Sequence, residues 1–145
     1  MKTICFGHSK LFDYEEELYK PVRESELNRE YNIIFPHENG NKFYNSKELF
    51  QSGKCDYFIA EVSFPTTSLG IEMGWADLLN IPIICVYKKG SKVSKSLGAV
   101  TDKFIEYSDK QDLLTKLEEC FSGSRLRGRD DNIKLFSVDR FFFRN

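Results

Sequence analysis

The chain has 145 residues, of which 41% are hydrophobic, with 21 Lys and Arg against 22 Asp and Glu. A chain of this length buries roughly 68–70% of its unfolded surface, enough for one soluble domain with its own core. The formal net charge of -1 excludes a general nucleic-acid binder, because such a protein carries a concentrated basic excess. No apolar run approaches the ~18 residues that span a bilayer, and residues 1–10 lack the apolar centre of a signal peptide. We therefore expect a cytoplasmic protein with neither a membrane nor a nucleic-acid polymer as its partner.

Short apolar runs alternate with amphipathic stretches, as they do in βαβ units around a parallel sheet. The run 81–87 is almost continuously apolar, which is typical of a strand buried on both faces, so we place it at the centre of the sheet. We predict a single-domain, Rossmann-like, three-layer α/β sandwich with a five-stranded, mainly parallel sheet and helices on both faces. The expected strands cover residues 3–6, 32–35, 56–62, 81–87 and 104–107.

Four helical stretches have apolar residues at helical spacing among charged ones. The first contains Pro21, which predicts a kink or a break. The last opens with a capping box formed by Ser108 and Gln111. The expected helices cover residues 12–30, 46–51, 70–79 and 108–120.

The last segment differs in composition from the rest of the chain. A linker rich in Gly, Arg and Asp begins at Ser122, and the terminus ends in an aromatic run at residues 141–143. We divide the chain into an α/β domain at residues 1–121 and a linker with an aromatic extension at residues 122–145. Because exposed apolar patches favour association, we expect the extension to pack on the body or on a neighbouring subunit.

The cysteines and histidines do not indicate a metal site or a disulfide framework. Cys5, Cys55, Cys85 and Cys120 form no C-x-x-C pair, and we interpret them as reduced core thiols. The chain has 2 histidines, too few for a histidine-rich metal site. We predict neither a metal nor another cofactor.

Ligands of open parallel sheets bind beyond the carboxyl ends of the strands, so the loops there are candidate sites. Gly7, His8 and Ser9 follow the first predicted strand and offer a flexible backbone and a hydroxyl, as a phosphate cradle requires. An ordinary glycine turn would have the same residues. The spacing leaves both interpretations open.

The loop after the third predicted strand ends in a carboxylate, Glu72, at the start of the helix 70–79. A carboxylate in a first helical turn is stabilised as an anion by the helix dipole, by roughly 0.3–1 kcal/mol, so we expect Glu72 to be ionised. Composition alone does not distinguish a functional Glu72 from one that only complements the dipole.

The sequence Cys-Asp-Tyr-Phe-Ile-Ala-Glu-Val-Ser at residues 55–63, Pro65, Gly-Ile-Glu-Met-Gly-Trp-Ala at residues 70–76 and the strand at residues 81–86 resemble the nucleoside 2-deoxyribosyltransferase superfamily. Within it, the sequence is most similar to the 2'-deoxynucleoside 5'-phosphate N-hydrolases. The resemblance is specific over residues 55–86 and extends to about residue 120 in the order of elements.

The resemblance implies that Glu72 is a nucleophile that attacks C1' of deoxyribose. Cleavage of an N-glycosidic bond passes through an oxocarbenium-like state that a carboxylate can capture, while a second group protonates the leaving base. The family's second carboxylate, eight residues before Asp56, corresponds to Glu48. Glu48 is otherwise read as a solvated helix residue.

The resemblance also implies a substrate pocket with a hydroxyl for the 5'-phosphate, from Thr66 or the nearby Ser68. Ser96 would come from the neighbouring subunit of a homodimer, and Lys92 and Lys95 beside it would suit an anionic substrate. The substrate-binding residues would be Gly7, His8, Ser9, His37, Thr66, Ser68, Gly70 and Ser96.

Two positions depart from the family pattern. Ile4 stands where these enzymes commonly have a tyrosine that positions sugar and nucleophile, and Ser68 stands where the first loop glycine would be. Either change is compatible with a different substrate, with slow turnover, or with binding that is not followed by hydrolysis.

The sequence thus predicts an enzyme that cleaves the N-glycosidic bond of a nucleoside 5'-monophosphate or nucleoside by hydrolysis or base exchange. The hydroxyls and lysines favour a monophosphate and hydrolysis. Its partner would be this small molecule, and the chain would form a homodimer or a higher homo-oligomer. The alternatives are a nucleotide-sensing module of the same fold and an enzyme for another N-glycoside, such as a dinucleotide or a modified pyrimidine nucleotide.

Overall fold

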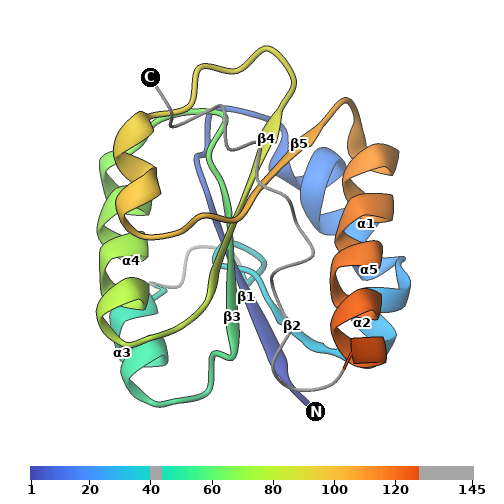
Figure 1. The fold of residues 1–145 in the computed structure, drawn as a ribbon, viewed down its shortest axis with the longest axis horizontal. Coiled ribbons are helices and arrows are strands. Elements are labelled where there is room, and N and C mark those ends of the chain that lie inside the picture. The colour runs from blue at the N-terminus through green and yellow to red at the C-terminus, as the bar shows by residue number, and fades with distance from the viewer. Residues whose placement is uncertain (40–43, 128–145) are drawn as a thin grey trace.

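The computed structural model describes residues 1–39 and 44–127, with side chains up to residue 123. These residues form one 5-stranded sheet in the order β2-β1-β3-β4-β5, and each neighbouring pair is parallel (Figure 1). The predicted α/β fold class is therefore confirmed. The strands are β1 Thr3–His8, β2 Asn32–Ile34, β3 Tyr57–Glu61, β4 Ile83–Lys88 and β5 Phe104–Tyr107.

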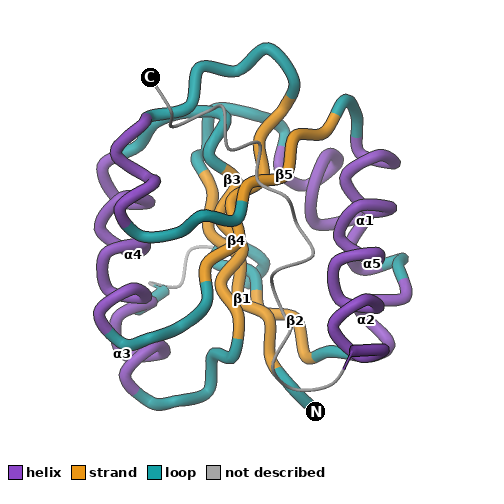
Figure 2. Tube along the Cα trace, viewed as in Figure 1, coloured by secondary structure: helices purple, strands orange, loops and turns teal. Residues whose placement is uncertain are grey.

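Helices cover both faces of this sheet (Figure 2). The first face carries the π-helical turn η1 Glu15–Tyr19, α1 Lys20–Arg23, α2 Glu26–Glu30 and α5 Lys110–Arg127; α3 Ser46–Gln51 and α4 Thr67–Leu78 lie on the other side (Figure 1). A 3₁₀ turn, η2 Lys95–Ala99, follows β4. No helix in the described part of the chain is both long and apolar enough to cross a membrane.

Side chains alternate across the sheet and divide the core into two clusters. Ile4 and Phe6 of β1 pack in the cluster that includes Leu113 and Leu117 of α5. Cys5, between them, belongs to the cluster on the other face, with Met73 of α4. The parity of a residue in β1 therefore decides which helices its side chain meets.

Strand β1 is longer than predicted. Gly7 is paired with Ala60, and His8 with Glu61, so the strand does not end at residue 6. A Cβ on Gly7 would lie 2.6 Å from Cζ of Phe58 and 2.9 Å from Cδ1 of Leu69. Gly7 is thus a strand residue on which Leu69 packs closely, and the interpretation as a flexible loop glycine was wrong.

The first helical stretch does not break at its proline. Pro21 lies in the first turn of α1, after the π-helical turn, and the break comes at Ser25, the residue before α2. Proline cannot donate to the carbonyl four residues earlier and its ring crowds that carbonyl; a widened turn before it relieves both constraints. The chain therefore continues through Pro21 as a helix.

Helix α4 begins earlier than the predicted residue 70. Its N-cap is Thr66, whose Oγ1 accepts a hydrogen bond from the Leu69 amide at 3.2 Å. A capping hydroxyl satisfies one of the free amides of a first turn. Glu72 consequently lies in the second turn of α4, and the first turn contains no acidic residue.

The sheet is centred on β3, because β4 lies one position towards the β5 edge, so the prediction that residues 81–87 form the centre was wrong.

The last helix is capped by Asp109, whose Oδ1 accepts from the Asp112 amide at 2.8 Å, and not by a Ser108–Gln111 box. It runs on to Arg127, past the predicted end near Cys120. The described part of the predicted linker is thus helical, since one interior glycine costs a helix only about 1 kcal/mol. The rest of the predicted extension lies outside the described residues.

We predict that Gly7→Ala destabilises the fold by about 2 kcal/mol, because the new methyl group would overlap Phe58 and Leu69. Urea unfolding measures the loss. The control is Gly74→Ala, where a Cβ meets nothing within 4 Å and the helix interior favours alanine. Equal midpoints for wild type and Gly7→Ala would contradict the close packing described above.

Candidate active site

The candidate nucleophile, Glu72, is a half-buried carboxylate on α4. Its Oε2 is buried and has no hydrogen-bond partner among the described residues. Burial raises the pKa of Glu72 to about 7, and the Ser46 hydrogen bond opposes this rise. The expectation of a dipole-stabilised anion was therefore wrong: Glu72 lies one turn beyond the dipole's strongest influence, and desolvation dominates.

Helix α3 buries Ser46 and leaves Glu48 at the surface. Ser46 is buried and is the first residue of α3, which Asn45 caps by accepting from the Glu48 amide at 3.0 Å. Glu48 is exposed. Residues two apart on a helix point in nearly opposite directions, so only one of the two can face α4.

Tyr44 is a further neighbour of Glu72 that sequence reasoning missed. It is half-buried just before α3, and its pKa is raised mainly by burial and further by its electrostatic interactions with Cys5 and Glu72. At neutral pH Tyr44 therefore carries a protonated hydroxyl. No sequence motif marks this residue.

Ile4, which stands where the family commonly has a tyrosine, lies on the face of the sheet opposite to α4. Ile4 packs in the cluster of the α5 face, whereas Cys5 is the β1 residue in the cluster beneath α4. A side chain at position 4 therefore points away from Glu72.

His8, Tyr19 and His37 are joined at the carboxyl end of β1. His8 Nδ1 lies 2.8 Å from the carbonyl oxygen of Ser9, and its Nε2 lies 2.5 Å from the Tyr19 hydroxyl. Because a carbonyl only accepts, Nδ1 carries the proton, and Tyr19 then donates to Nε2. The Tyr19 hydroxyl accepts in turn from the His37 amide at 3.2 Å. Two predicted binding residues are thereby held together by a tyrosine the sequence did not single out.

Aromatic rings surround this group. The His8 ring lies 4.5 Å from Tyr14 and 5.4 Å from His37, centroid to centroid. Phe12 stacks on Phe64, of the loop between β3 and α4, at 5.7 Å. Ring faces such as these bind nucleobases by stacking.

Ser9 is buried and its hydroxyl accepts from the Leu11 amide at 3.0 Å. This hydrogen bond stabilises the turn after β1.

A cavity of about 380 Å³ contains three of the other predicted binding residues. Thr66, Gly70 and Ser96 line it, and the Ser96 hydroxyl lies 2.7 Å from that of Ser94. Ser68 is exposed and is not a lining residue. Ser96 thus reaches the same cavity as Thr66 of its own chain. The lining residues are Val62, Phe64, Pro65, Thr66, Thr67, Leu69, Gly70, Met73, Ser94, Ser96 and Leu97.

Buried Glu61 fixes the start of the loop between β3 and α4. Its carboxylate accepts from the Ser63 amide at 2.5 Å, from the Ser63 hydroxyl at 3.0 Å and from the Tyr107 hydroxyl. The Ser63 hydroxyl also accepts from the Lys88 amide at 2.8 Å. Glu61 therefore ties the carboxyl ends of β3, β4 and β5 together, which anchors the loop leading to Glu72.

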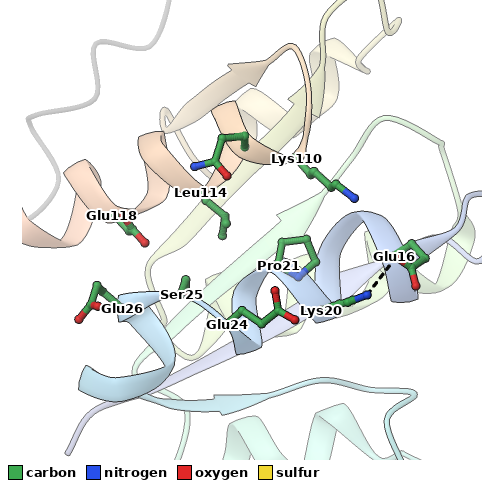
Figure 3. Close-up of a pocket in the computed structure, with 10 residues that line it drawn as sticks. Glu16, Lys20, Pro21, Glu24, Ser25, Glu26, Lys110, Leu114 and Glu118 are labelled. Carbon is green, nitrogen blue, oxygen red and sulfur yellow. Dashed lines mark ion pairs between the residues drawn. The ribbon is translucent and has the colours of Figure 1, made fainter.

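A second cavity, of about 370 Å³, lies between α1, α2 and α5 on the face away from α4 (Figures 1 and 3). Its walls are mostly charged, and the exposed Lys20–Glu16 pair lies at its edge with 3.8 Å between Nζ and Oε2. Glu72 and the other predicted site residues do not line it. In the described ranges, no group of three or more His, Cys, Asp and Glu could hold a metal ion.

Known proteins share both the fold and part of the sequence. The chain is 29% identical over 115 residues to the 5-hydroxymethyl-dUMP N-hydrolase of Esox lucius, covering 76% of this chain and 78% of that protein. The CMP N-glycosidase BcmB of Clostridium botulinum has a TM-score of 0.57 at 18% identity, covering 81% of this chain and 99% of its own. A conserved protein from Enterococcus faecalis V583 has a TM-score of 0.59 at 16% identity, covering 82% and 98%. No family model matches the chain.

The fold is that of an α/β protein with a candidate carboxylate nucleophile beside the carboxyl edge of a parallel sheet. The resemblance inferred from residues 55–86 is confirmed, because the Esox lucius enzyme and the Clostridium botulinum enzyme both belong to the nucleoside 2-deoxyribosyltransferase-like superfamily. The chain is therefore similar in sequence and in fold to members of the nucleoside 2-deoxyribosyltransferase-like superfamily.

We predict that Glu72→Gln stabilises the protein at pH 8 by about 2 kcal/mol and has little effect at pH 5. The folded-state pKa of Glu72, about 7, lies above its ordinary 4.5, so ionisation costs stability as the pH rises between these values. Urea unfolding at both pH values measures the effect. The exposed Glu48→Gln serves as control and should show no such difference.

Burial lowers the pKa of His8 from 6.5 to about 4, so the folded state keeps it neutral. Its stabilisation is complete above about pH 6.5 and is lost as the pH falls towards 4. Between pH 7.5 and 5 we expect the wild type to lose about 2 kcal/mol more than His8→Asn, measured by urea unfolding. If wild type and His8→Asn lost equal amounts of unfolding free energy between pH 7.5 and 5, His8 would be protonated in the folded protein at pH 5.

Proposed function

We propose that this protein hydrolyses the N-glycosidic bond of a nucleoside 5'-monophosphate, with Glu72 as the nucleophile. One observation carries the proposal: Oε2 of Glu72 is buried without a partner in the described structure, beside the carboxyl edge of the sheet. A buried carboxylate oxygen without a hydrogen bond costs free energy, and a reacting sugar would give it a partner.

In the proposed reaction a Glu72 oxygen bonds to C1' as the bond from C1' to the base nitrogen breaks. The bonding electrons leave with the base, which takes up a proton. Water then attacks C1' of the glycosyl ester, loses a proton, and releases the sugar phosphate and the Glu72 carboxylate. Because attack requires the ionised form, the pKa of about 7 predicts activity that rises with pH through neutrality.

The relatives' names support a monophosphate as substrate. The Esox lucius enzyme is named for 5-hydroxymethyl-dUMP and the Clostridium botulinum enzyme for CMP, and both of these compounds are nucleoside monophosphates. The cavity at the N-terminus of α4 supports the same choice, since Thr66, Gly70 and Ser96 line it and free amides of a first helical turn favour a phosphate. We propose that the base stacks among Phe12, Tyr14 and His37.

We propose further that the enzyme works in the cytoplasm as a homodimer. Charged nucleotides are retained inside cells, which supports the compartment. Ile71 and Leu78, 47% and 81% exposed, lie seven residues apart on one face of α4, and such an apolar face supports a second subunit as its partner. In such a dimer Ser96 would bind the substrate of its own subunit, of the partner subunit, or of both.

A nucleotide-sensing module of the same fold is the second candidate. Its support is that Glu48, the predicted second carboxylate, is exposed, whereas Ser46 is the polar residue that α3 buries. A site without a second carboxylate would bind a nucleotide and leave its base in place.

The test incubates purified protein with deoxy- and ribonucleoside monophosphates and the matching nucleosides, and follows free base by chromatography. We expect release from at least one monophosphate, and a loss of about 10³-fold or more in Glu72→Gln. The unphosphorylated nucleoside should be the poorer substrate.

Two results would contradict this function. Unchanged base release by Glu72→Gln would remove Glu72 as the nucleophile. Tight binding of a monophosphate without release of base at pH 8, where Glu72 is ionised, would favour the sensing module.

A further inference from the structure

Two stacked aromatic rings join the loops on which the two groups of candidate site residues lie. Phe12 lies in the segment after β1, and Phe64 lies in the loop between β3 and α4. Their ring centroids are 5.7 Å apart and their planes are inclined by 16°. Ring pairs in this offset arrangement attract one another beyond the area that they bury.

Each ring also belongs to one of the two proposed subsites. The Phe12 ring lies 5.9 Å from that of His8 and 6.3 Å from that of Tyr14, centroid to centroid, in the aromatic group proposed for the base. Phe64 lines the cavity of about 380 Å³ proposed for the phosphate, as Thr66 does. The stack is therefore a direct contact between the two subsites.

Hydrogen bonds fix the backbone from which each ring projects. The Ser9 hydroxyl accepts from the Leu11 amide at 3.0 Å, and the Ser63 hydroxyl accepts from the Lys88 amide at 2.8 Å. Leu11 and Ser63 are each followed directly by one of the stacked rings. The stack thus holds two anchored loops at one separation.

A nucleoside monophosphate has to bind at both subsites at once, because its sugar joins the base to the phosphate. Once one group is bound, the other binds at an effective concentration that depends on how well the separation of the subsites matches the ligand. If the two loops could change their separation, the ligand would have to order them, which costs affinity. A ligand that fills one subsite alone does not bear this cost.

We propose that Phe12 and Phe64 form a specificity-determining pair, whose stack holds the base and phosphate subsites at the separation of a nucleoside 5'-monophosphate. The pair makes the site favour the monophosphate over the unphosphorylated nucleoside. This inference rests on the proposed function and deepens it, because it names the residues that join the two subsites.

The experiment measures affinities by titration calorimetry in the Glu72→Gln background, which lacks the proposed nucleophile and leaves the ligands intact. The probes are 5-hydroxymethyl-dUMP with its nucleoside, and CMP with cytidine. The quantity compared is the affinity for the monophosphate divided by the affinity for its nucleoside. In at least one probe pair we expect Phe64→Leu to lower this ratio about fivefold. Phe12→Leu should lower it equally, although Phe12 does not line the cavity, and the double variant should lower it no further.

Two variants serve as controls. Phe64→Tyr keeps a ring that can stack and should keep the ratio. Leu11→Ala is the matched control, because Leu11 is 74% exposed in the same turn as Phe12, and it should not change the ratio. Urea unfolding gives a readout without ligand: the double variant should lose less stability than the sum of the two single losses.

Three results would overturn the proposal: additive losses in urea, equal weakening of monophosphate and nucleoside by Phe12→Leu, or no binding of either monophosphate. If wild type released base while Phe64→Leu kept the ratio, the proposed function would stand and this inference would fail. If wild type released no base while both leucine variants lowered the ratio, hydrolysis would be refuted and the role of the ring pair would stand.

Discussion

The site depends on how closely α4 approaches β1. Gly7 presents no Cβ, so Leu69 of α4 and Phe58 of β3 meet directly over the strand. This contact fixes the first turn of α4 against the sheet, and the second turn, with Glu72, is carried into position beside α3. A larger residue at position 7 would shift the helix and the carboxylate with it.

The same packing explains why the candidate nucleophile is poised near neutrality. Glu72 is surrounded by the apolar layer between α3, α4 and the sheet, and burial raises its pKa to about 7. One hydrogen bond from Ser46 limits that rise. The site therefore holds a carboxylate that is ionised in only part of the molecules at neutral pH, a costly arrangement that a purely structural glutamate would not need.

The other group of candidate site residues, at the carboxyl end of β1, consists of neutral side chains. His8 is held uncharged by burial, and Tyr19 links it to the His37 amide. Rings from three segments of the chain, Phe12 and Tyr14, His37, and Phe64, gather at this point. An uncharged aromatic surface of this kind suits a flat base, whereas the hydroxyl-lined cavity at α4 suits an anion.

The sequence by itself determined the succession of strands and helices along the chain, the parallel sheet and the resemblance to the superfamily, because apolar periodicity and the motif around Glu72 are local features of the chain. Only the tertiary structure decided what surrounds Glu72. The family resemblance pointed to Glu48 and to position 4, but α3 buries Ser46 and leaves Glu48 exposed, and the alternation along β1 places Ile4 on the other face of the sheet. The raised pKa of Glu72 could not be predicted from the sequence either. It is caused by burial, and burial depends on how α3, α4 and the sheet pack against one another.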